Sequence, residues 1–215
     1  MYFKFFKLHS WGKRSVSRRR RFIQRFLERS MAMDHGASSY RRYLDGNEEA
    51  FDEILKEYWA PLVSFLGRMV GVTAAAEDIT MDVFADLIAD RKKYNFKVSL
   101  KTYLYMLGRS RALNYIKRNR IVPTVPLEDV FSLPSLEPGP EAKLLSRERS
   151  EAVAKAMGDL PRDMRDALVL TYWEGLSCEE AAKVMKKSRK QVYNLLYRAK
   201  AQLRAALESE GIYEF

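Results

Sequence analysis

Hydrophobic residues recur along most of this chain at the three- and four-residue spacing of an α-helix, without the two-residue alternation of a strand. In "NEEAFDEILKEYWAPLVSFLGRMVG" the apolar side chains share one face, and Gly71 predicts the end of that helix. A second helix is predicted over residues 74–94. Its apolar face would carry Ile79, Val83, Phe84, Leu87 and Ile88. The pattern predicts an all-α fold.

The stretch "IVPTVPLEDVFSLPSLEPGPEA" interrupts this pattern, because five of the seven prolines fall between residues 121 and 140. Proline lacks an amide hydrogen and resists helix, so an extended linker is predicted. Residues 121–142 also hold four acids and no base. The chain should therefore form two small helical domains joined by a Pro-rich acidic linker. The expected boundaries are a basic, disordered N-terminal extension at 1–37, a first domain at 38–120, the linker at 121–146 and a second domain at 147–210.

Two helix-start signals lie close together in "GLSCEEAAKVMKKSRKQVYNLLYRAK", residues 175–200. Ser177 with Glu180 fits a capping box, in which side chain and backbone satisfy each other's free amides. Ser188 with Gln191 repeats the pattern eleven positions later. A short helix, a tight turn near residues 186–187 and a second helix are predicted. This arrangement is a helix–turn–helix.

The second of these helices is expected to have two unlike faces. Its apolar stripe is Val192, Leu195, Leu196, Ala199 and Leu203, and residues 181–207 contain eight bases and no acid. Arginine can bind guanine and asparagine adenine, while lysine and tyrosine reach phosphates, so the helix suits a major groove. The alternative is an ordinary helical hairpin with a polar outer face. The opposite, polar arc is formed by Lys190, Tyr193, Asn194, Tyr197 and Arg198.

Charge is sorted into blocks along the chain. Residues 1–30 hold ten bases and one acid, so the remaining 185 residues carry only +1 of the net +10. Residues 41–90 contain eleven acids and four bases, whereas residues 91–120 contain ten bases and no acid. Asp78, Asp82, Asp86 and Asp90 recur every four residues, and such like-charged neighbours cost a helix about 0.2–0.5 kcal/mol per pair. A basic partner docking on this row is expected; a solvated acidic stripe is the alternative.

Other classes of protein find little support in the composition. One cysteine, Cys178, and two histidines give no metal-ligand spacing, so no metal, cofactor or disulfide is expected. The apolar runs are too short for stable membrane insertion, and cysteine usage suits a cytoplasmic protein. A nucleic-acid-processing enzyme would need clustered carboxylates or a histidine-centred site. Asp78 and Asp82 come nearest to a ligand set and nothing completes it, so no catalytic residue is predicted.

Taken together, residues 40–207 resemble the extracytoplasmic-function (ECF) sigma factors of bacterial RNA polymerase, which have regions 2 and 4 of the sigma-70 family. "AEDITMDVFADLI" resembles the helix that docks on the clamp helices of the largest polymerase subunit. "SLKTYLYMLGRSRALNYIKRNR" resembles the −10 reader. "LPRDMRDALVLTYWEGLSCEEAAKVM" with "SRKQVYNLLYRAKAQLR" resembles the −35 reader.

The resemblance implies a sigma factor that binds core RNA polymerase and directs promoter-specific transcription initiation, and it implies control by an anti-sigma factor. The alternative is a stand-alone helix–turn–helix transcriptional regulator, which copurification with core polymerase would distinguish. Melted −10 DNA needs cations for its backbone and aromatic faces for its bases, and family members capture a flipped base in a loop corresponding to residues 95–98. The implied polymerase-binding residues are Asp78, Asp82, Phe84 and Asp86. The implied −10 DNA-binding residues are Asn95, Phe96, Lys97, Lys101, Tyr103, Tyr105 and Arg109. The implied −35 DNA-binding residues are Arg189, Lys190, Tyr193, Asn194, Tyr197, Arg198 and Lys200.

The chain departs from the family pattern at several positions. Met81 stands where a glutamine is frequent in the docking helix, and Tyr103 stands where a tryptophan is common. Residues 1–30 have no family counterpart and lack the apolar stretch of a signal peptide. They form either a disordered arm with affinity for DNA or membrane surfaces, or a segment upstream of a translation start at Met33.

Overall fold

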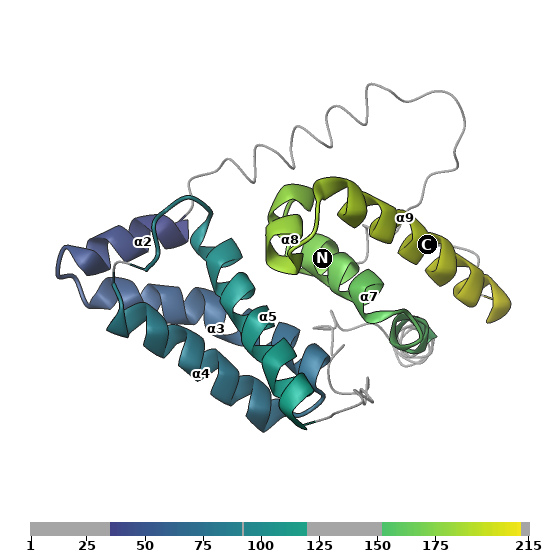
Figure 1. Cartoon of the computed structure of the whole chain (residues 1–215), viewed down its shortest axis with the longest axis horizontal. Coiled ribbons are helices and arrows are strands. Elements are labelled where there is room, and N and C mark those ends of the chain that lie inside the picture. Colours follow the sequence, from purple (N-terminus) through teal and green to yellow (C-terminus); the bar gives the residue numbers. More distant parts are fainter. Residues whose placement is uncertain (1–34, 92, 120–151, 212–215) are drawn as a thin grey trace, which may run out of the picture.

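The computed structural model describes residues 35–91, 93–119 and 152–211, and these ranges consist mainly of helices and contain no strand (Figure 1). The all-α prediction is therefore confirmed. The predictions for residues 1–34 of the basic extension, for a start at Met33 and for the linker at 121–146 lie outside the described residues. The extension was predicted to reach residue 37, which is wrong at its end, because residues 35–37 form the first turn of a helix and Gly36 and Ala37 are buried. Within the described part of the chain, no helix has both the length and the apolar character needed to cross a membrane.

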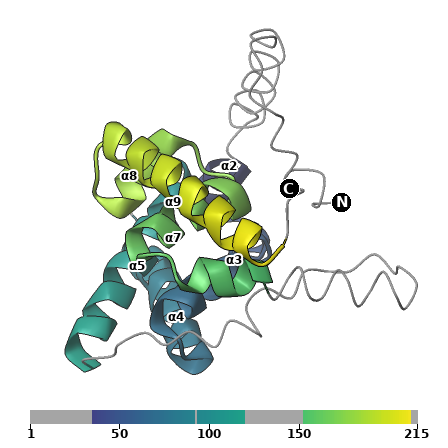
Figure 2. The ribbon, with the colours of Figure 1, turned by 90° about the vertical axis from the view of Figure 1, so that its right-hand side faces the viewer.

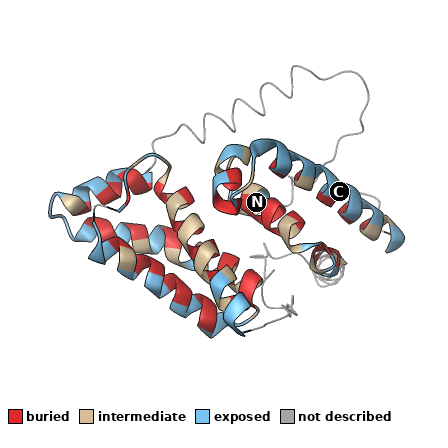
Figure 3. Cartoon of the chain, viewed as in Figure 1, coloured by how far each residue is buried: buried red, intermediate tan, exposed pale blue. Residues whose placement is uncertain are grey.

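The first domain is built around one long helix. This helix, α3 (Glu49–Val70), contacts α2 (His35–Leu44), α4 (Thr73–Ala89) and α5 (Leu100–Asn119). It ends, as predicted, at Gly71, whose φ of +74° is a left-handed conformation that glycine adopts without strain. Buried faces of the helices point inward and exposed faces outward (Figure 3). The most buried large side chains of the domain are Tyr40, Ile54, Leu62, Phe65, Leu66, Leu87, Leu100, Leu104 and Tyr105.

Helices α3 and α5 approach closely at Gly108. A Cβ at this position would lie 3.2 Å from Leu62 Cδ1 and 3.3 Å from Leu66 Cδ1, tighter than most side-chain contacts. The absence of a side chain on α5 thus lets the two leucines of α3 fill the space. Dense packing of this kind is characteristic of protein interiors.

Helix α2 is anchored to the end of α4 by Tyr40. The Tyr40 hydroxyl lies 3.0 Å from the carbonyl oxygen of Leu87 and 3.1 Å from that of Arg91. Burial raises the pKa of Tyr40 to about 12, so its hydroxyl stays protonated and can donate to these oxygens. The anchor places α2 beside the loop that follows α4.

The apolar face predicted for residues 74–94 is correct for Ile79, Val83, Phe84 and Leu87, which are buried. The prediction is wrong for Ile88, which is 46% exposed. Successive residues turn by about 100° around a helix, so Ile88 lies beyond the edge of the arc that faces α3.

The second domain contains helical residues 152–158, followed by α7 (Arg162–Leu168), the single π-helical turn η2 (Val169–Trp173), α8 (Cys178–Met185) and α9 (Arg189–Ser209). Helix α9 packs on both α7 and α8. The wide turn η2 ends with the amide of Glu174 donating to the carbonyl oxygen of Val169 at 3.0 Å.

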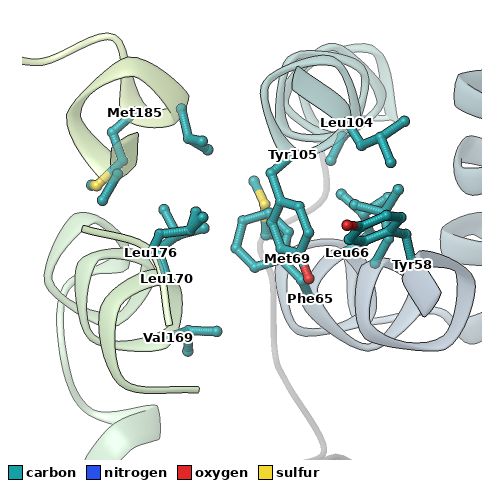
Figure 4. Close-up of a cluster of buried hydrophobic side chains, with 14 of the residues drawn as sticks. Tyr58, Phe65, Leu66, Met69, Leu104, Tyr105, Val169, Leu170, Leu176 and Met185 are labelled. Carbon is teal, nitrogen blue, oxygen red and sulfur yellow. The ribbon is translucent and has the colours of Figure 1, made fainter. Parts of the chain in front are cut away.

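The two domains lie against each other, with α5 packed on α8 (Figures 1 and 2). Their buried apolar side chains form one cluster. In Figure 4, Tyr105 and Met69 of the first domain face Leu170 and Leu176 of the second. The sequence pattern predicted two helical domains but gave no sign that they share a core.

Candidate nucleic-acid interface

Both predicted capping boxes are present, so the helix–turn–helix is confirmed. The amide of Glu180 donates to Ser177 Oγ at 3.2 Å, and the amide of Ser177 donates to Glu180 Oε2 at 2.9 Å. The amide of Gln191 donates to Ser188 Oγ at 3.2 Å, and that of Ser188 to Gln191 Oε1 at 2.7 Å. Each box satisfies amides that the start of a helix leaves free.

The turn between the two helices is made by Lys186, whose φ of +53° is left-handed. Glycine is usual at such a position, and a lysine there carries strain of about 1 kcal/mol. The amide of Lys187 donates to the Ala182 carbonyl oxygen at 2.9 Å and closes the turn. The backbone thus keeps the helix–turn–helix geometry despite the unusual residue.

Helix α9 has the two faces that the sequence predicts. Val192, Leu196, Ala199 and Leu203 are buried and Leu195 is half-buried. Every side chain predicted to bind −35 DNA lies on the exposed side, and Tyr197 reaches 76% exposure. The resulting surface carries cations, an amide and two phenols. Its members are Arg189, Lys190, Tyr193, Asn194, Tyr197, Arg198 and Lys200.

Tyr172 of η2 adds an aromatic side chain to this surface that the sequence did not reveal. Lys200 Nζ lies 4.8 Å from the centre of the Tyr172 ring, which is itself exposed. Toward the start of α9, the Arg189 guanidinium lies 5.5 Å from the Tyr193 ring. These contacts hold two long cations next to aromatic rings and limit their rotamers. Tyr172 was missed because the π turn breaks the helical periodicity.

The aspartates predicted to form an acidic row on α4 are partly neutralised within the chain. Arg111 of α5 lies 3.2 Å from Asp82 Oδ2 through Nη1 and 2.5 Å from Asp86 Oδ2 through Nη2. The hydrogen bond from Arg111 is the main reason that the pKa of Asp86 is lowered. Asp78 is exposed. The repulsion between neighbouring aspartates that the sequence predicts is thus relieved in part by Arg111 of the same chain, and a docking protein is not needed for this.

Phe84 does not belong to the exposed face of α4. It is 3% exposed, and its ring stacks on that of Trp59 with centroids 5.8 Å apart. Its prediction as a polymerase contact needs correction, because its position on the helix points it into the core against α3. The large apolar side chains that α4 does expose are Met81 and Ile88. Met81 stands between Asp78 and Asp82 in the sequence, so the exposed face combines charge with apolar surface.

The loop predicted to capture a flipped base has a defined shape. Asn95 Oδ1 accepts a hydrogen bond from the amide of Lys97 at 3.2 Å, and the intervening Phe96 has a φ of +60°. Such a conformation is unusual for a bulky residue and is held by its surroundings. The Phe96 ring lies 4.7 Å from that of Tyr94 and 4.8 Å from the guanidinium of Arg41. Arg41 was missed because it comes from α2, far away in the sequence.

The residues predicted to bind −10 DNA fall into two groups. Four of them lie at or near the loop: Asn95 and Lys97 are exposed, and Phe96 and Tyr103 are half-buried. The other three, Lys101, Tyr105 and Arg109, lie on the face of α5 that meets the second domain. Tyr105 and Arg109 are buried there. In this arrangement they are not open to DNA, because Glu174 covers Tyr105 and Asp166 of α7 covers Arg109. Their role on −10 DNA stays a prediction that would require the two domains to separate.

No group of three histidine, cysteine or acidic side chains within residues 35–91, 93–119 and 152–211 could hold a metal ion.

Comparisons with known proteins agree with this geometry. Residues 54–121 match the family described as sigma-70 region 2, and residues 150–203 match sigma-70, region 4. The RNA polymerase sigma-H factor of Pseudomonas aeruginosa is 28% identical over 172 residues, which cover 76% of this chain and 89% of the relative. The ECF RNA polymerase sigma factor SigM of Bacillus subtilis is 26% identical over 161 residues, covering 75% and 96%.

Among solved structures, the sigma factor RpoE in complex with the anti-sigma factor NepR, from Bartonella quintana, matches with a TM-score of 0.57. The two chains are 20% identical, and the match covers 74% of this chain and 96% of the other. This likeness supports the fold. The chain belongs to the sigma-70 family, in its extracytoplasmic-function group, and its two domains carry regions 2 and 4.

Proposed function

We propose that this chain is a sigma factor that binds core RNA polymerase and directs promoter-specific transcription initiation. The observation that carries the proposal is the presence of both sigma-70 regions, with an exposed face on helix α9 of region 4 that has no acid from residue 189 to residue 207. Region 4 would read −35 duplex DNA, and region 2 would dock on the polymerase and read −10 DNA. A stand-alone regulator would need region 4 alone, so region 2 argues against that alternative.

In region 4, α9 would enter the major groove with its N-terminal half. Asn194 and Arg198 would reach base edges, since an amide pairs with adenine and a guanidinium with guanine. Arg189, Lys190 and Lys200 would contact phosphates and set the register of the helix on the duplex. The aromatic contacts of Arg189 and Lys200 would restrict these side chains before DNA arrives.

In region 2, the loop at residues 95–98 would receive an extruded −10 base. Extrusion costs a few kcal/mol, which the protein must recover through stacking and hydrogen bonds. The half-buried ring of Phe96 offers a stacking face, and exposed Asn95 and Lys97 offer polar groups. Arg41 would supply a cation beside the same ring. We assign Arg41 to this site in addition to the residues predicted from the sequence.

The exposed face of α4 would dock on the polymerase through Asp78, Asp82 and Met81. A basic partner surface would be attracted by the two carboxylates and would cover the exposed methionine. Competition for Asp82 between Arg111 and the partner would be part of the binding equilibrium. Phe84 would support this face from beneath by packing on Trp59.

The docking proposal can be tested by measuring assembly with core polymerase. The Asp78→Asn/Asp82→Asn variant should associate more slowly and with a weaker dependence on salt, because it lacks the charges that steer the encounter. The Asp52→Asn/Glu57→Gln variant removes two exposed charges from α3 and should assemble like the wild type. Unchanged assembly of the α4 variant would contradict the docking proposal.

We further propose that the protein acts in the cytoplasm, has no catalytic residue of its own and is controlled by an anti-sigma factor. The solved Bartonella quintana sigma factor is in complex with such a partner, which supports this extension. Control by an anti-sigma factor can be tested by purifying the full-length protein from its own cells and identifying the proteins that copurify with it, in fractions that contain core polymerase and in fractions that do not. A partner that competes with polymerase would support the proposal, and free, polymerase-independent promoter binding would favour a stand-alone regulator.

A further inference from the structure

The side chains that region 2 would use on −10 DNA are partly covered by carboxylates of region 4. Arg109 of α5 donates from Nε to Asp166 Oδ2 at 3.1 Å and from Nη2 to the same oxygen at 3.0 Å. Asp163 Oδ1 lies 3.5 Å from Nη2. The side chains of Arg109 and Asp166 are only 7% and 6% exposed. Both acids belong to α7, so this contact joins the two regions.

Glu174 makes a second contact of the same kind. Its carboxylate accepts a hydrogen bond from the Tyr105 hydroxyl, and its carbonyl oxygen accepts one from Lys101 Nζ at 2.6 Å. Lys101 Nζ also lies 3.5 Å from Glu174 Oε2. Arg68 of α3 is close enough to interact electrostatically with this carboxylate. One acidic residue of region 4 therefore engages three cationic or phenolic groups of region 2.

Glu180 completes the interface at the start of α5. Its Oε1 accepts hydrogen bonds from Ser99 Oγ at 3.0 Å and from Thr102 Oγ1 at 3.2 Å. Its other oxygen serves the capping box at Ser177. The start of α8 and the start of α5 are thus tied together by one carboxylate, close to the loop at residues 95–98.

Single-stranded DNA is held by cations, which bind its phosphates, and by aromatic rings, which stack on its bases, and α5 carries both kinds of group along one face. Here their partners are carboxylates, which are anionic hydrogen-bond acceptors like phosphates. We propose that Asp163, Asp166 and Glu174 of region 4 occupy the place of the −10 strand on α5, so that the closed arrangement is self-inhibited. This inference rests on the proposed function. Opening of the two regions would have to precede capture of the −10 strand.

Apolar contacts extend the same interface. Tyr105 and Met69 face Leu170 and Leu176 across the boundary in Figure 4. Burial of these side chains favours the closed arrangement in the free subunit. Only an interaction that favours the separated regions can shift this equilibrium, and binding of both regions to polymerase would do so.

A reversible covalent lock tests the inference on the full chain with core polymerase. Ser99→Cys and Glu180→Cys, in a Cys178→Ser background, place thiols on the two sides of the interface. A short bismaleimide linker with an internal disulfide can join them, and dithiothreitol then cleaves the linker. Run-off transcription by the linked protein should fall by about tenfold or more, because the competent population is removed, and should recover after cleavage.

The matched control carries Asp52→Cys and Lys56→Cys, one turn apart on the exposed side of α3, in the same Cys178→Ser background. The linker should leave its transcription unchanged. If the linked interface variant transcribes as well as the unlinked one, self-inhibition is overturned while the proposed function stands. If the unlinked proteins and wild type all fail to direct transcription, the proposed function itself is overturned.

A second variant avoids any linker. Glu174→Gln removes the charge facing Lys101 but keeps an acceptor for Tyr105, so the free subunit should open more readily. Its affinity for a fluorescent pool of random single-stranded DNA should rise by about threefold or more, since a larger fraction is competent to bind. Asp159→Asn makes the same charge change at an exposed site of region 4. An equal rise in both variants would indicate a general charge effect and overturn the inference.

Discussion

Arg109 of α5 and Asp166 of α7 form a buried ion pair that joins the two regions, with Nε–Oδ2 and Nη2–Oδ2 distances of 3.1 and 3.0 Å. Burial raises the pKa of Asp166, and the nearby guanidinium acts in the opposite direction. Removing one member of a buried pair costs about 3–5 kcal/mol, because the other charge is left without compensation. The pair therefore makes the closed arrangement depend strongly on both residues.

Asp166→Ala should separate the two regions rather than unfold them. Opening of the interface returns Arg109 to water, and each region keeps its own packed helices. We expect a larger radius of gyration in small-angle X-ray scattering and an unchanged helical circular dichroism signal. The charge-matched control is Asp159→Asn, which should keep the wild-type dimensions. A compact Asp166→Ala protein would contradict the role of this ion pair.

The contribution of Glu180 to the free energy of unfolding should depend on pH. Burial disfavours its ionised form, but hydrogen bonds from Ser177, Ser99 and Thr102 outweigh this effect and lower its pKa. The stabilisation is therefore present above the ordinary value of 4.5 and is lost as the pH falls through the lowered pKa. Glu180→Gln keeps a capping-box side chain but loses the charge. The substitution should lower the free energy of unfolding by about 1 kcal/mol at neutral pH.

Urea unfolding of Glu180→Gln and wild type across a pH series measures this difference. The difference in the free energy of unfolding should close in acid, because the side chain at position 180 is then uncharged in both proteins. Glu179→Gln removes an exposed charge that pairs with Lys183 at 3.5 Å, and such surface pairs contribute about 0–1 kcal/mol. A gap for Glu180→Gln that persists unchanged below the lowered pKa would refute the assignment.

Two glycines of region 2 should respond oppositely to substitution. Gly67→Ala places a Cβ 3.9 Å from the Ala76 side chain, an ordinary contact, and improves helix propensity by about 1 kcal/mol. Gly108→Val would force methyl groups against Leu62 and Leu66 and should cost about 1–3 kcal/mol through overpacking. Denaturant unfolding of the two variants tests both signs. A Gly108→Val protein as stable as wild type would show that α3 and α5 can move apart freely.

Lys200 should contribute to DNA affinity through a phosphate contact. Lys200→Ala should weaken binding to mixed-sequence duplex DNA and reduce the salt slope by about 1, since one fewer counterion is released. Arg204→Ala changes the next turn of α9, where the guanidinium already pairs with Glu208 at 2.7 Å. Fluorescence anisotropy in a salt titration should show a smaller change for Arg204→Ala. Equal slopes for wild type and Lys200→Ala would remove Lys200 from the interface.

Local features of this protein could be predicted from its sequence because they depend on neighbouring residues. The capping boxes at Ser177 and Ser188, the end of α3 at Gly71 and the two faces of α9 follow from side-chain spacing and backbone hydrogen bonding alone. The family resemblance then supplied the order of the two regions. None of these inferences required knowledge of distant contacts.

Long-range contacts limited the site prediction. Arg109 lies in a block without acids, so its charge suggested DNA, yet its partner Asp166 comes 57 positions later in another helix. Arg111 likewise pairs with Asp82 and Asp86 of α4. The sequence did not reveal this pairing, so the acidic row carries less unpaired charge than its spacing suggested. Phe84 was assigned to a docking surface although it stacks on Trp59. Spacing along one helix does not reveal which face another helix will cover.

The most direct test of the account is transcription by core polymerase on a library of promoter-like sequences, with and without the purified subunit. The account predicts that the subunit directs initiation to templates sharing one −35 and one −10 sequence, and that Asp78→Asn/Asp82→Asn reduces this output. Start sites that are the same with and without the subunit would contradict it.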